Sequence, residues 1–142
     1  MNKQQLIQLV LDSFRAEQEG NTKKGLNLIS PNYQVIEMYL DKNDQPFPTI
    51  SGKAVEENIK KVYQIKGREY QFKNILADEE KGIVIVEWVE SYIDELTGQK
   101  FRTPIVGVFE IKNDKIQRAR HYTDPRLSWK YLSQEVIDKA FE

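Results

Sequence analysis

The 142-residue sequence predicts one α+β domain, in which helices pack on a curved antiparallel sheet and enclose a pocket for a small molecule. Two observations support this fold class. Apolar residues at helical spacing dominate the first half of the chain, whereas β-branched and aromatic runs separated by turn residues dominate the second half. The length fits one domain, and no linker or internal repeat divides the chain. We therefore treat residues 1–142 as a single domain.

The helices are predicted from amphipathic segments and from residues that begin or end a helix. Leu6, Val10 and Phe14 recur at helical spacing, and Gly20 follows as a residue that accepts the left-handed conformation past a helix end. Thr22 and Ser133 are candidate N-caps, and Pro31 ends the second helix. Helices are therefore expected over residues 3–18, from Thr22 to Pro31, over residues 52–66 and after Ser133.

The strands are predicted from runs of β-branched and aromatic residues that turn residues separate. Thr97-Gly98 and Asn113-Asp114 indicate hairpin turns. Pro125 closes the last strand because it has no N–H to donate to a ladder. Strands are expected over residues 33–40, 69–77, 83–96, 100–112 and 115–123, with a loop over residues 41–51.

Both faces of the predicted sheet are expected to be covered. Side chains alternate between the faces of a strand, and both sets of the strand over residues 83–96 are largely apolar. We expect the helices on the inner face and a homodimer joined through the outer face; the alternative is that the C-terminal tail folds over the outer face. The apolar outer set is Ile83, Ile85, Val89, Ile93, Pro104, Val106, Val108 and Ile116. The charged side chains expected to pair across the two-fold axis are Glu87, Glu110, Arg102, Arg118 and Arg120.

Composition excludes several classes of function. The chain has 21 basic and 22 acidic residues, so no strong field attracts nucleic acid or a membrane surface. No apolar run approaches the ~20 residues that span a bilayer, and the N-terminus lacks the apolar core of a signal peptide. One histidine and no cysteine argue against a zinc site and disulfides. We therefore predict a cytoplasmic protein without a metal or cofactor.

Three segments of the chain resemble a known group of proteins. They are Thr97-Gly98, the run from Val106 to Ile111, and the run from Lys115 to Pro125, which contains Arg120-His121-Tyr122-Thr123-Asp124. They are similar to the nuclear-transport-factor-two-like superfamily, in its SnoaL-like and limonene-epoxide-hydrolase-like branches, and the order of elements agrees over most of the chain. The resemblance implies a cone-shaped curved antiparallel sheet with N-terminal helices on its concave face, the cystatin-like α+β barrel. It also implies dimers that pair their sheets.

The resemblance supplies candidate positions for chemistry. In the epoxide hydrolases, two aspartates and an arginine activate water, with help from a tyrosine and an asparagine. The arginine position falls at Trp88, and the two aspartate positions fall at Glu90 and His121. The tyrosine falls at Val35 and the asparagine at Glu37. Only Glu90 keeps the type of charge, so the resemblance does not favour epoxide hydrolysis by that mechanism.

The remaining groups form a candidate acid–base site. A carboxylate beside an imidazole can move protons near neutral pH, so His121 and Glu90 are expected to exchange the proton, within reach of a hydrogen bond or one water. Glu37 is expected to orient substrate or a water. The expected ligand-binding residues are Trp88, Tyr92, Val35, Thr103, Ile105, Thr123 and Trp129.

The predicted function is that of a cofactor-independent isomerase, cyclase or hydrolase acting on a small, mostly apolar molecule with a carbonyl group. Two alternatives stay open at this point. His121 and Glu90 can serve as structural hydrogen-bonding groups, with Trp88 and Tyr92 as core. The whole domain can also be a non-catalytic module that binds a small molecule or another protein, since fold does not give function.

Overall fold

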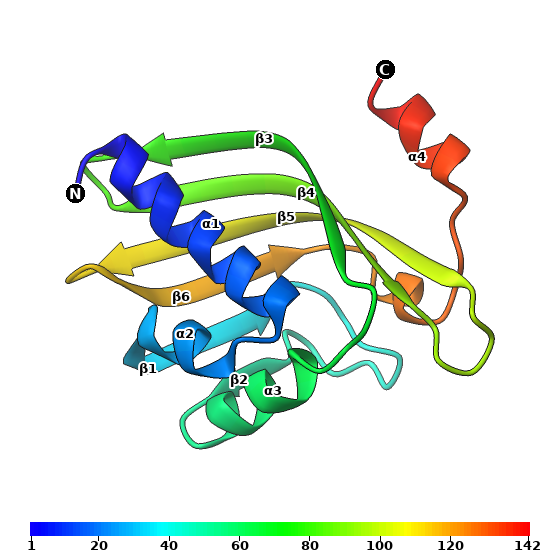
Figure 1. Ribbon diagram of the computed structural model, residues 1–142, viewed down its shortest axis with the longest axis horizontal. Coiled ribbons are helices and arrows are strands. Elements are labelled where there is room, and N and C mark those ends of the chain that lie inside the picture. Colours follow the sequence, from blue (N-terminus) through cyan, green and yellow to red (C-terminus); the bar gives the residue numbers. More distant parts are fainter.

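Four α-helices and one six-stranded sheet make up the computed structural model, which describes residues 1–142 (Figure 1). The sheet is curved and unclosed, with the strand order β2-β1-β6-β5-β4-β3. The helices are α1 (Lys3–Glu19), α2 (Thr22–Asn27), α3 (Ala54–Val62) and α4 (Gln134–Ala140), with a 3₁₀ turn at Pro125–Ser128. The strands are β1 (Ile29–Glu37), β2 (Thr49–Ser51), β3 (Glu69–Asp78), β4 (Ile83–Ile93), β5 (Lys100–Lys112) and β6 (Lys115–Tyr122).

Helix α1 begins and ends as its sequence predicts. The side chain of Asn2 accepts a hydrogen bond from the backbone of Gln5, whose own side chain bonds back to the cap. Gly20 ends the helix in the left-handed conformation, at φ 69°. The helix lies across the concave face of the sheet, which we call the inner face (Figure 1). Its buried side chains are Leu6, Leu9, Val10, Phe14 and Ala16.

The hairpins of the second half also follow the sequence. Strands β4 and β5 pair along their whole length, from Ile83 opposite Glu110 to Ile93 opposite Lys100. The turn between β5 and β6 consists of Asn113 and Asp114, both at positive φ, as a two-residue hairpin requires. The long strands that carry the inner face were therefore predictable from local signals.

The first strand differs from its prediction. It runs from Ile29 to Glu37 instead of over residues 33–40, and Pro31 lies inside it rather than ending a helix. The β1–β6 pairing is irregular between Ile29 and Gln34, so no regular ladder bond is required of Pro31. Strand β1 pairs in parallel with β6, which makes the sheet mixed rather than purely antiparallel.

The segment expected as a loop over residues 41–51 contains a short strand. Strand β2 pairs antiparallel with β1 through three residues, and such a short strand leaves no readable alternation in the sequence. Helix α3 is also shorter than the predicted span over residues 52–66, because it ends before Tyr63.

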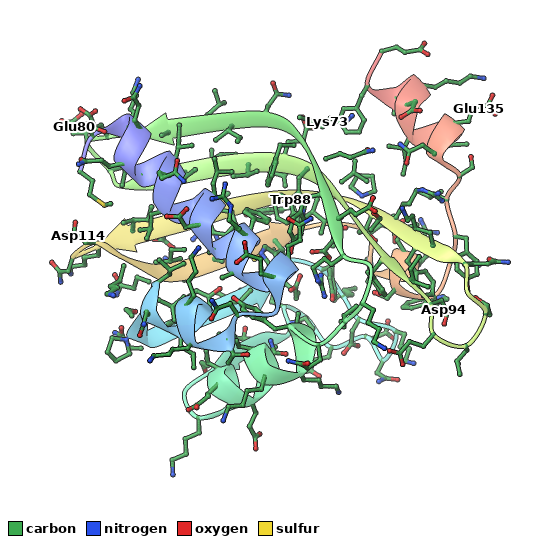
Figure 2. All side chains as sticks on the ribbon, viewed as in Figure 1. Lys73, Glu80, Trp88, Asp94, Asp114 and Glu135 are labelled. Carbon is green, nitrogen blue, oxygen red and sulfur yellow. The ribbon has the colours of Figure 1, made fainter.

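The core lies between α1 and the inner face of the sheet. Figure 2 shows Trp88 on the sheet, beside the C-terminal half of α1, and its side chain is only 2% exposed. The Phe14 ring meets the Trp88 indole edge-on at 4.8 Å between ring centroids. Gly107 makes room for this indole: a Cβ at that position would lie 2.9 Å from the rings of Trp88 and Phe109.

One residue expected on the outer face lies on the inner one. Ile116 is 2% exposed and belongs to the core cluster around α1. The β5–β6 pairing shifts between Glu110 and Ile111, so the strict alternation counted along β6 fails at this point. A β-bulge inserts one residue and reverses the facing of the side chains beyond it, which explains why simple alternation misplaced Ile116.

The C-terminal tail covers one end of the outer face. Arg102 donates hydrogen bonds to the Leu132 carbonyl and to the side chain of Gln134. Gln134 of α4 also donates to Gln71, which lies opposite Val89, and Val89 is 2% exposed. Ile137 of α4 is buried as well. The alternative given above, in which the C-terminal tail folds over the outer face, is therefore correct for part of that face. Ile85 remains 38% exposed, so the tail leaves the rest of this face open.

Charged side chains of the outer face pair with groups of the same chain. Both Arg118 and Arg120 pair with Glu110 of the same chain. Glu87 accepts a hydrogen bond from Asn74 at 2.8 Å. The expectation that these groups pair across a two-fold axis is therefore not supported.

None of the helices combines the length and the hydropathy that a membrane-spanning segment requires.

Candidate active site

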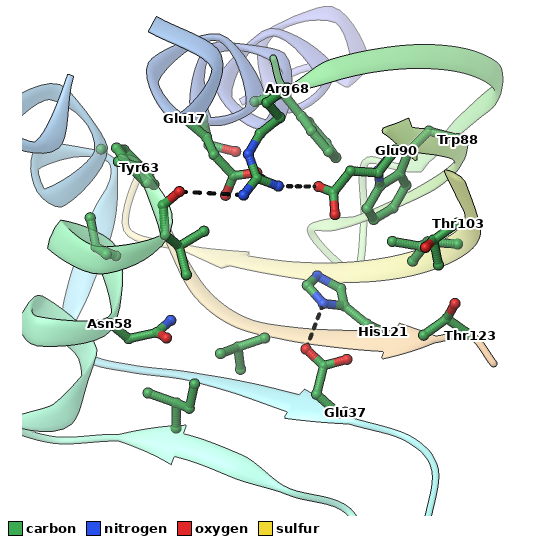
Figure 3. A pocket seen from close by; sticks show the side chains of 18 of the residues that line it. Glu17, Glu37, Asn58, Tyr63, Arg68, Trp88, Glu90, Thr103, His121 and Thr123 are labelled. Atoms are coloured by element: carbon green, nitrogen blue, oxygen red, sulfur yellow. Dashed lines mark hydrogen bonds and ion pairs between the residues drawn. The ribbon is translucent and has the colours of Figure 1, made fainter. Parts of the chain in front are cut away.

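A cavity of about 340 Å³ lies between the inner face of the sheet and the helices (Figure 3). Its walls include residues of α1, α2, α3 and five strands of the sheet, all but β3. More than half of the 28 lining residues are hydrophobic. A concave, mostly apolar site with a few converging polar groups is the usual form of a small-molecule site.

The register of the sheet brings three functional candidates to this cavity. His121 lies opposite Gly107 on β5 and next to Glu37 on the parallel strand β1. Glu90 lies on β4 opposite Thr103. Glu37 and His121 therefore project from neighbouring strands of the inner face and Glu90 from β4, on the other side of β5, and all three line the cavity.

His121 and Glu37 form a hydrogen-bonded pair. The Nδ1 atom of His121 lies 3.1 Å from Oε1 of Glu37. Burial lowers the pKa of His121, but the hydrogen bond and the negative charge of Glu37 outweigh burial and raise it above its ordinary value. Figure 3 shows the second ring nitrogen of His121 on the side of the cavity that holds Arg68 and Glu90. The imidazole can therefore take up or release a proton at Nε2 while Glu37 holds Nδ1.

Arg68 organises the opposite wall of the cavity. Its side chain is 4% exposed, and its Nη1 lies 2.9 Å from Oε1 of Glu90 and 3.3 Å from Oε1 of Glu17. Its Nη2 donates to the carbonyl of Val62 at 3.3 Å. The hydroxyl of Tyr70 donates to Glu17 as well. This network fixes two carboxylates from different elements around one guanidinium.

Glu90 is poised to change its protonation state near neutral pH. Burial and the charge of Glu17 raise the pKa of Glu90 to about 7, against the lowering effects of Arg68 and His121. A carboxyl group with such a pKa can donate a proton at pH 7, which an ordinary ionised glutamate does not do. The cavity thus holds two groups with a raised pKa, Glu90 at about 7 and His121 above its ordinary value.

The expected pairing between Glu90 and His121 takes a different form. Each of the two side chains has another hydrogen-bond partner, Arg68 for Glu90 and Glu37 for His121. Both nevertheless line one cavity, and the charge of each acts on the pKa of the other. The two groups therefore share one cavity without a direct bond.

Most of the expected ligand-binding residues line the cavity, and one does not. The 3₁₀ turn ends at Trp129, whose side chain is 46% exposed and lies outside the cavity, while Pro125 and Ser128 line it instead. The hydroxyl of Thr123 is engaged with the Pro104 carbonyl at 2.9 Å. The expected residues that line the cavity are Trp88, Tyr92, Val35, Thr103, Ile105 and Thr123.

The sequence analysis missed Arg68 and Glu17. A signal for Glu17 existed, because it follows Val10 by seven residues and so continues the buried stripe of α1. Arg68 had no such signal, since an arginine after Gly67 at the start of a strand is typical of a solvated loop end. No group of three or more His, Asp or Glu side chains is arranged to hold a metal ion.

No protein-family model matches the sequence, and no curated protein matches it. Solved structures do match its fold. A protein of Bacillus subtilis that is assigned as an isomerase superposes with a TM-score of 0.76 at 19% identity, over 94% of this chain and 100% of that chain. An epoxide hydrolase of M. tuberculosis, described as LEH-like, superposes with a TM-score of 0.66 at 20% identity, over 85% of this chain and 84% of that chain.

A third match is a Jannaschia protein assigned as a SnoaL-like polyketide cyclase. It superposes with a TM-score of 0.66 at 16% identity, over 85% of this chain and 86% of that chain. Proteins described as NTF2-like also match, one of them from Burkholderia xenovorans. The chain therefore has the NTF2-like fold that its sequence resembled, and identities this low show the fold alone.

Proposed function

We propose that this protein is a cofactor-independent acid–base enzyme of the isomerase, cyclase or hydrolase type. Its substrate is a small, mostly apolar molecule with a carbonyl group. The observation that carries the proposal is the presence of two proton-carrying groups with raised pKa values, Glu90 and His121, in one mostly apolar cavity. Structural neighbours assigned as an isomerase, an epoxide hydrolase and a cyclase support a reaction type that needs no cofactor.

His121 acts as the base in this proposal. Glu37 accepts a hydrogen bond from the Nδ1–H of His121. The lone pair of the neutral imidazole therefore lies on Nε2, on the cavity side. Nε2 takes a proton from the carbon next to the substrate carbonyl. The imidazolium that forms is stabilised by the negative charge of Glu37, which the hydrogen bond at 3.1 Å holds in place.

Glu90 acts as the acid. Its protonated form donates a proton to the carbonyl oxygen as the carbon loses one, so a neutral enol forms instead of an enolate. In an isomerase, His121 returns the proton to a different carbon while Glu90 takes back the proton of the enol. The two protons balance at the end of the cycle, and no oxidant or metal is required.

Deuterium exchange tests this proposal without knowledge of the natural substrate. The protein is incubated in deuterated buffer with small cyclic and aryl ketones, and incorporation next to the carbonyl is followed by NMR. We expect exchange above the buffer rate, and a loss of about 10²–10⁴-fold in His121→Ala. Glu87→Gln, which changes a carboxylate of the outer face, is the control and should keep the wild-type rate. Equal rates in His121→Ala and the wild type would rule out the proposed base.

The same assay separates an enzyme from a binding module. A ketone that stabilises the protein against heat but exchanges no faster than in buffer would indicate binding without catalysis. In that outcome the cavity would still define the ligand, but His121 and Glu90 would serve only to position it.

We also propose that two copies of the chain associate through the open part of the outer face. Leu76 is 65% exposed and Ile85 38% exposed on neighbouring strands that pair with each other. Val106 and Val108 continue this apolar area on β5. A contiguous apolar patch on a sheet is typical of an interface, and the α4 end of the face limits where a partner can lie.

Sedimentation at micromolar concentration tests the dimer. We expect twice the mass of the 16.7 kDa chain for the wild type, and a monomer for Ile85→Glu, which adds a charge to the patch. A monomeric wild type would contradict the proposal. We also propose a cytoplasmic location, since a chain without cysteine fits a reducing compartment.

A further inference from the structure

The cavity carries more negative than positive charge. Glu17, Glu37 and Glu90 line it, whereas Arg68 is the only lysine or arginine among the lining residues. A fourth lining carboxylate, Asp124, is paired at the surface with Arg126 at 2.7 Å and does not count toward this surplus. The surplus is two negative charges when Glu90 is ionised and one when Glu90 is protonated, and a protonated His121 offsets one of them.

The one permanent cation is not available to a ligand. Nη1 of Arg68 is shared by Glu90 and Glu17, and Nη2 is bonded to the carbonyl of Val62. Its Nε is buried and without a partner. A ligand carboxylate or phosphate would have to displace Glu90 or Glu17 from the guanidinium and would lie among like charges, which is unfavourable at low dielectric.

The unoccupied polar atoms of the cavity include carboxylate oxygens. Only Oε1 of Glu37 is bonded, to His121, and Oε2 makes no hydrogen bond within the protein. Figure 3 shows this second oxygen of Glu37 on the side of Thr123, away from the histidine. An ionised carboxylate oxygen without a partner accepts a hydrogen bond best from a charged donor.

The apolar walls suit a cation as well. Aromatic side chains are abundant among the lining residues, and the faces of indole and phenol rings attract ammonium groups. A site that combines carboxylates with aromatic rings therefore discriminates a cationic amine from a neutral molecule of the same shape. The aromatic lining residues are Phe14, Tyr33, Tyr39, Tyr63, Trp88, Tyr92 and Phe109.

We propose that the molecule bound in this cavity carries a protonated amine beside its apolar body, and that Oε2 of Glu37 accepts a hydrogen bond from the amine. This inference rests on the proposed function and narrows its substrate class to amino-carbonyl compounds. It leaves Glu90 and Nε2 of His121 free for the proton transfers described above.

Calorimetric titration at pH 7 with three probes that share a cyclohexyl ring tests the inference. The probes are cyclohexylmethylamine, cyclohexyl methyl ketone and cyclohexanecarboxylate, which carry a positive, no and a negative charge. We expect the amine to bind about tenfold more tightly than the ketone, and the carboxylate to bind most weakly. Equal affinities, tighter binding of the carboxylate, or no binding of the amine at millimolar concentration would overturn the inference.

The variant Glu37→Gln keeps an acceptor for His121 and removes the charge. It should lose the tenfold preference for the amine over the ketone, because only the amine gains from the charge of Glu37. The control Glu87→Gln, on the outer face, should keep the preference. If the preference survives in Glu37→Gln, the amine is bound elsewhere and the inference is wrong.

The outcomes also separate this inference from the proposed function. Exchange of ketone protons without a preference for the amine overturns the inference and leaves the acid–base function standing. A preference for the amine that Glu37→Gln abolishes, without any proton exchange, overturns the acid–base function and supports the inference as a statement about binding.

Discussion

The pKa of Glu90 is set by burial and by charged neighbours from other parts of the chain. Burial and Glu17 raise the pKa of its carboxyl group, and the guanidinium of Arg68 and the imidazole of His121 lower it, so that it settles at about 7. Each of these neighbours comes from a different part of the chain, namely α1, the segment just before β3, and β6. The sequence pointed to Glu90 by its place on an inner face. It could not show the guanidinium that holds Glu90, because that contact forms only when the sheet is assembled.

Glu17→Gln tests how this carboxyl group is tuned. The substitution removes a negative charge beside Glu90 but keeps oxygen and nitrogen atoms for Tyr70 and Arg68, so the pKa of Glu90 should fall. Catalysis in our proposal needs protonated Glu90, so the loss of exchange activity at high pH should begin at a lower pH than in the wild type. A pH–rate profile of deuterium exchange measures this shift, and an unchanged alkaline limb would contradict the role of Glu90 as acid.

At the scale of elements, the pairing of β1 with β6 decides the composition of the site. Parallel pairing puts Glu37 beside His121, although 84 positions separate them in the sequence. Local signals predicted the hairpins of the second half because Thr97-Gly98 and Asn113-Asp114 mark them in the sequence. Nothing local marks a parallel partner, so the partner of His121 was not identified from the sequence, although Glu37 was expected in the cavity. The bulge that turns Ile116 inward escaped for the same reason.

Gly107→Ala tests the packing between β5 and the indole of β4. The new methyl group would lie 2.9 Å from Trp88 and Phe109, so one of these rings must move. We expect the free energy of unfolding to fall by about 1–3 kcal/mol. Urea unfolding measures the loss, and near-ultraviolet circular dichroism reports whether the environment of the indole changes. Wild-type stability together with a wild-type spectrum would show that the contact is looser than described.

At the scale of the whole molecule, the proton-binding groups predict how stability depends on pH. The folded-state pKa of Glu90, about 7, lies above its ordinary value of 4.5. Its contribution is therefore complete below about 4.5 and is lost as the pH rises through about 7. The pKa of His121 is also raised, so its contribution is lost in the same direction, above 6.5. The Glu110 carboxyl, whose pKa its arginine partners lower, acts oppositely and only at acid pH.

We therefore expect the free energy of unfolding to decrease as the pH rises from 5 to 8. The slope should not exceed about 1.4 kcal/mol per pH unit for each group. Urea titrations at pH 5, 6, 7 and 8 measure it, and His121→Ala should flatten the part above pH 6.5. Stability that rises over this range would show that neither group binds its proton more tightly in the folded state.

The whole fold was more predictable than the site. Alternation along β4 and β5 indicated a sheet covered on both faces, and the structure shows α1 on the inner face and α4 on part of the outer one. Helix propensity and turn residues act locally, so they can be read from the sequence. The ion pairs of Arg68 and the exposure of Trp129 depend on how distant segments meet, so they cannot be predicted from local sequence patterns.

The most direct test of the central claim is an NMR titration of the two proton-carrying groups. Carboxyl carbon shifts of glutamate and ring nitrogen shifts of His121 are followed from pH 4 to 9, with Glu90→Gln used to assign the Glu90 signal. We predict a midpoint near 7 for Glu90 and a midpoint above 6.5 for His121. A Glu90 signal that titrates near 4.5, as a solvated glutamate does, would contradict the acid–base account of this cavity.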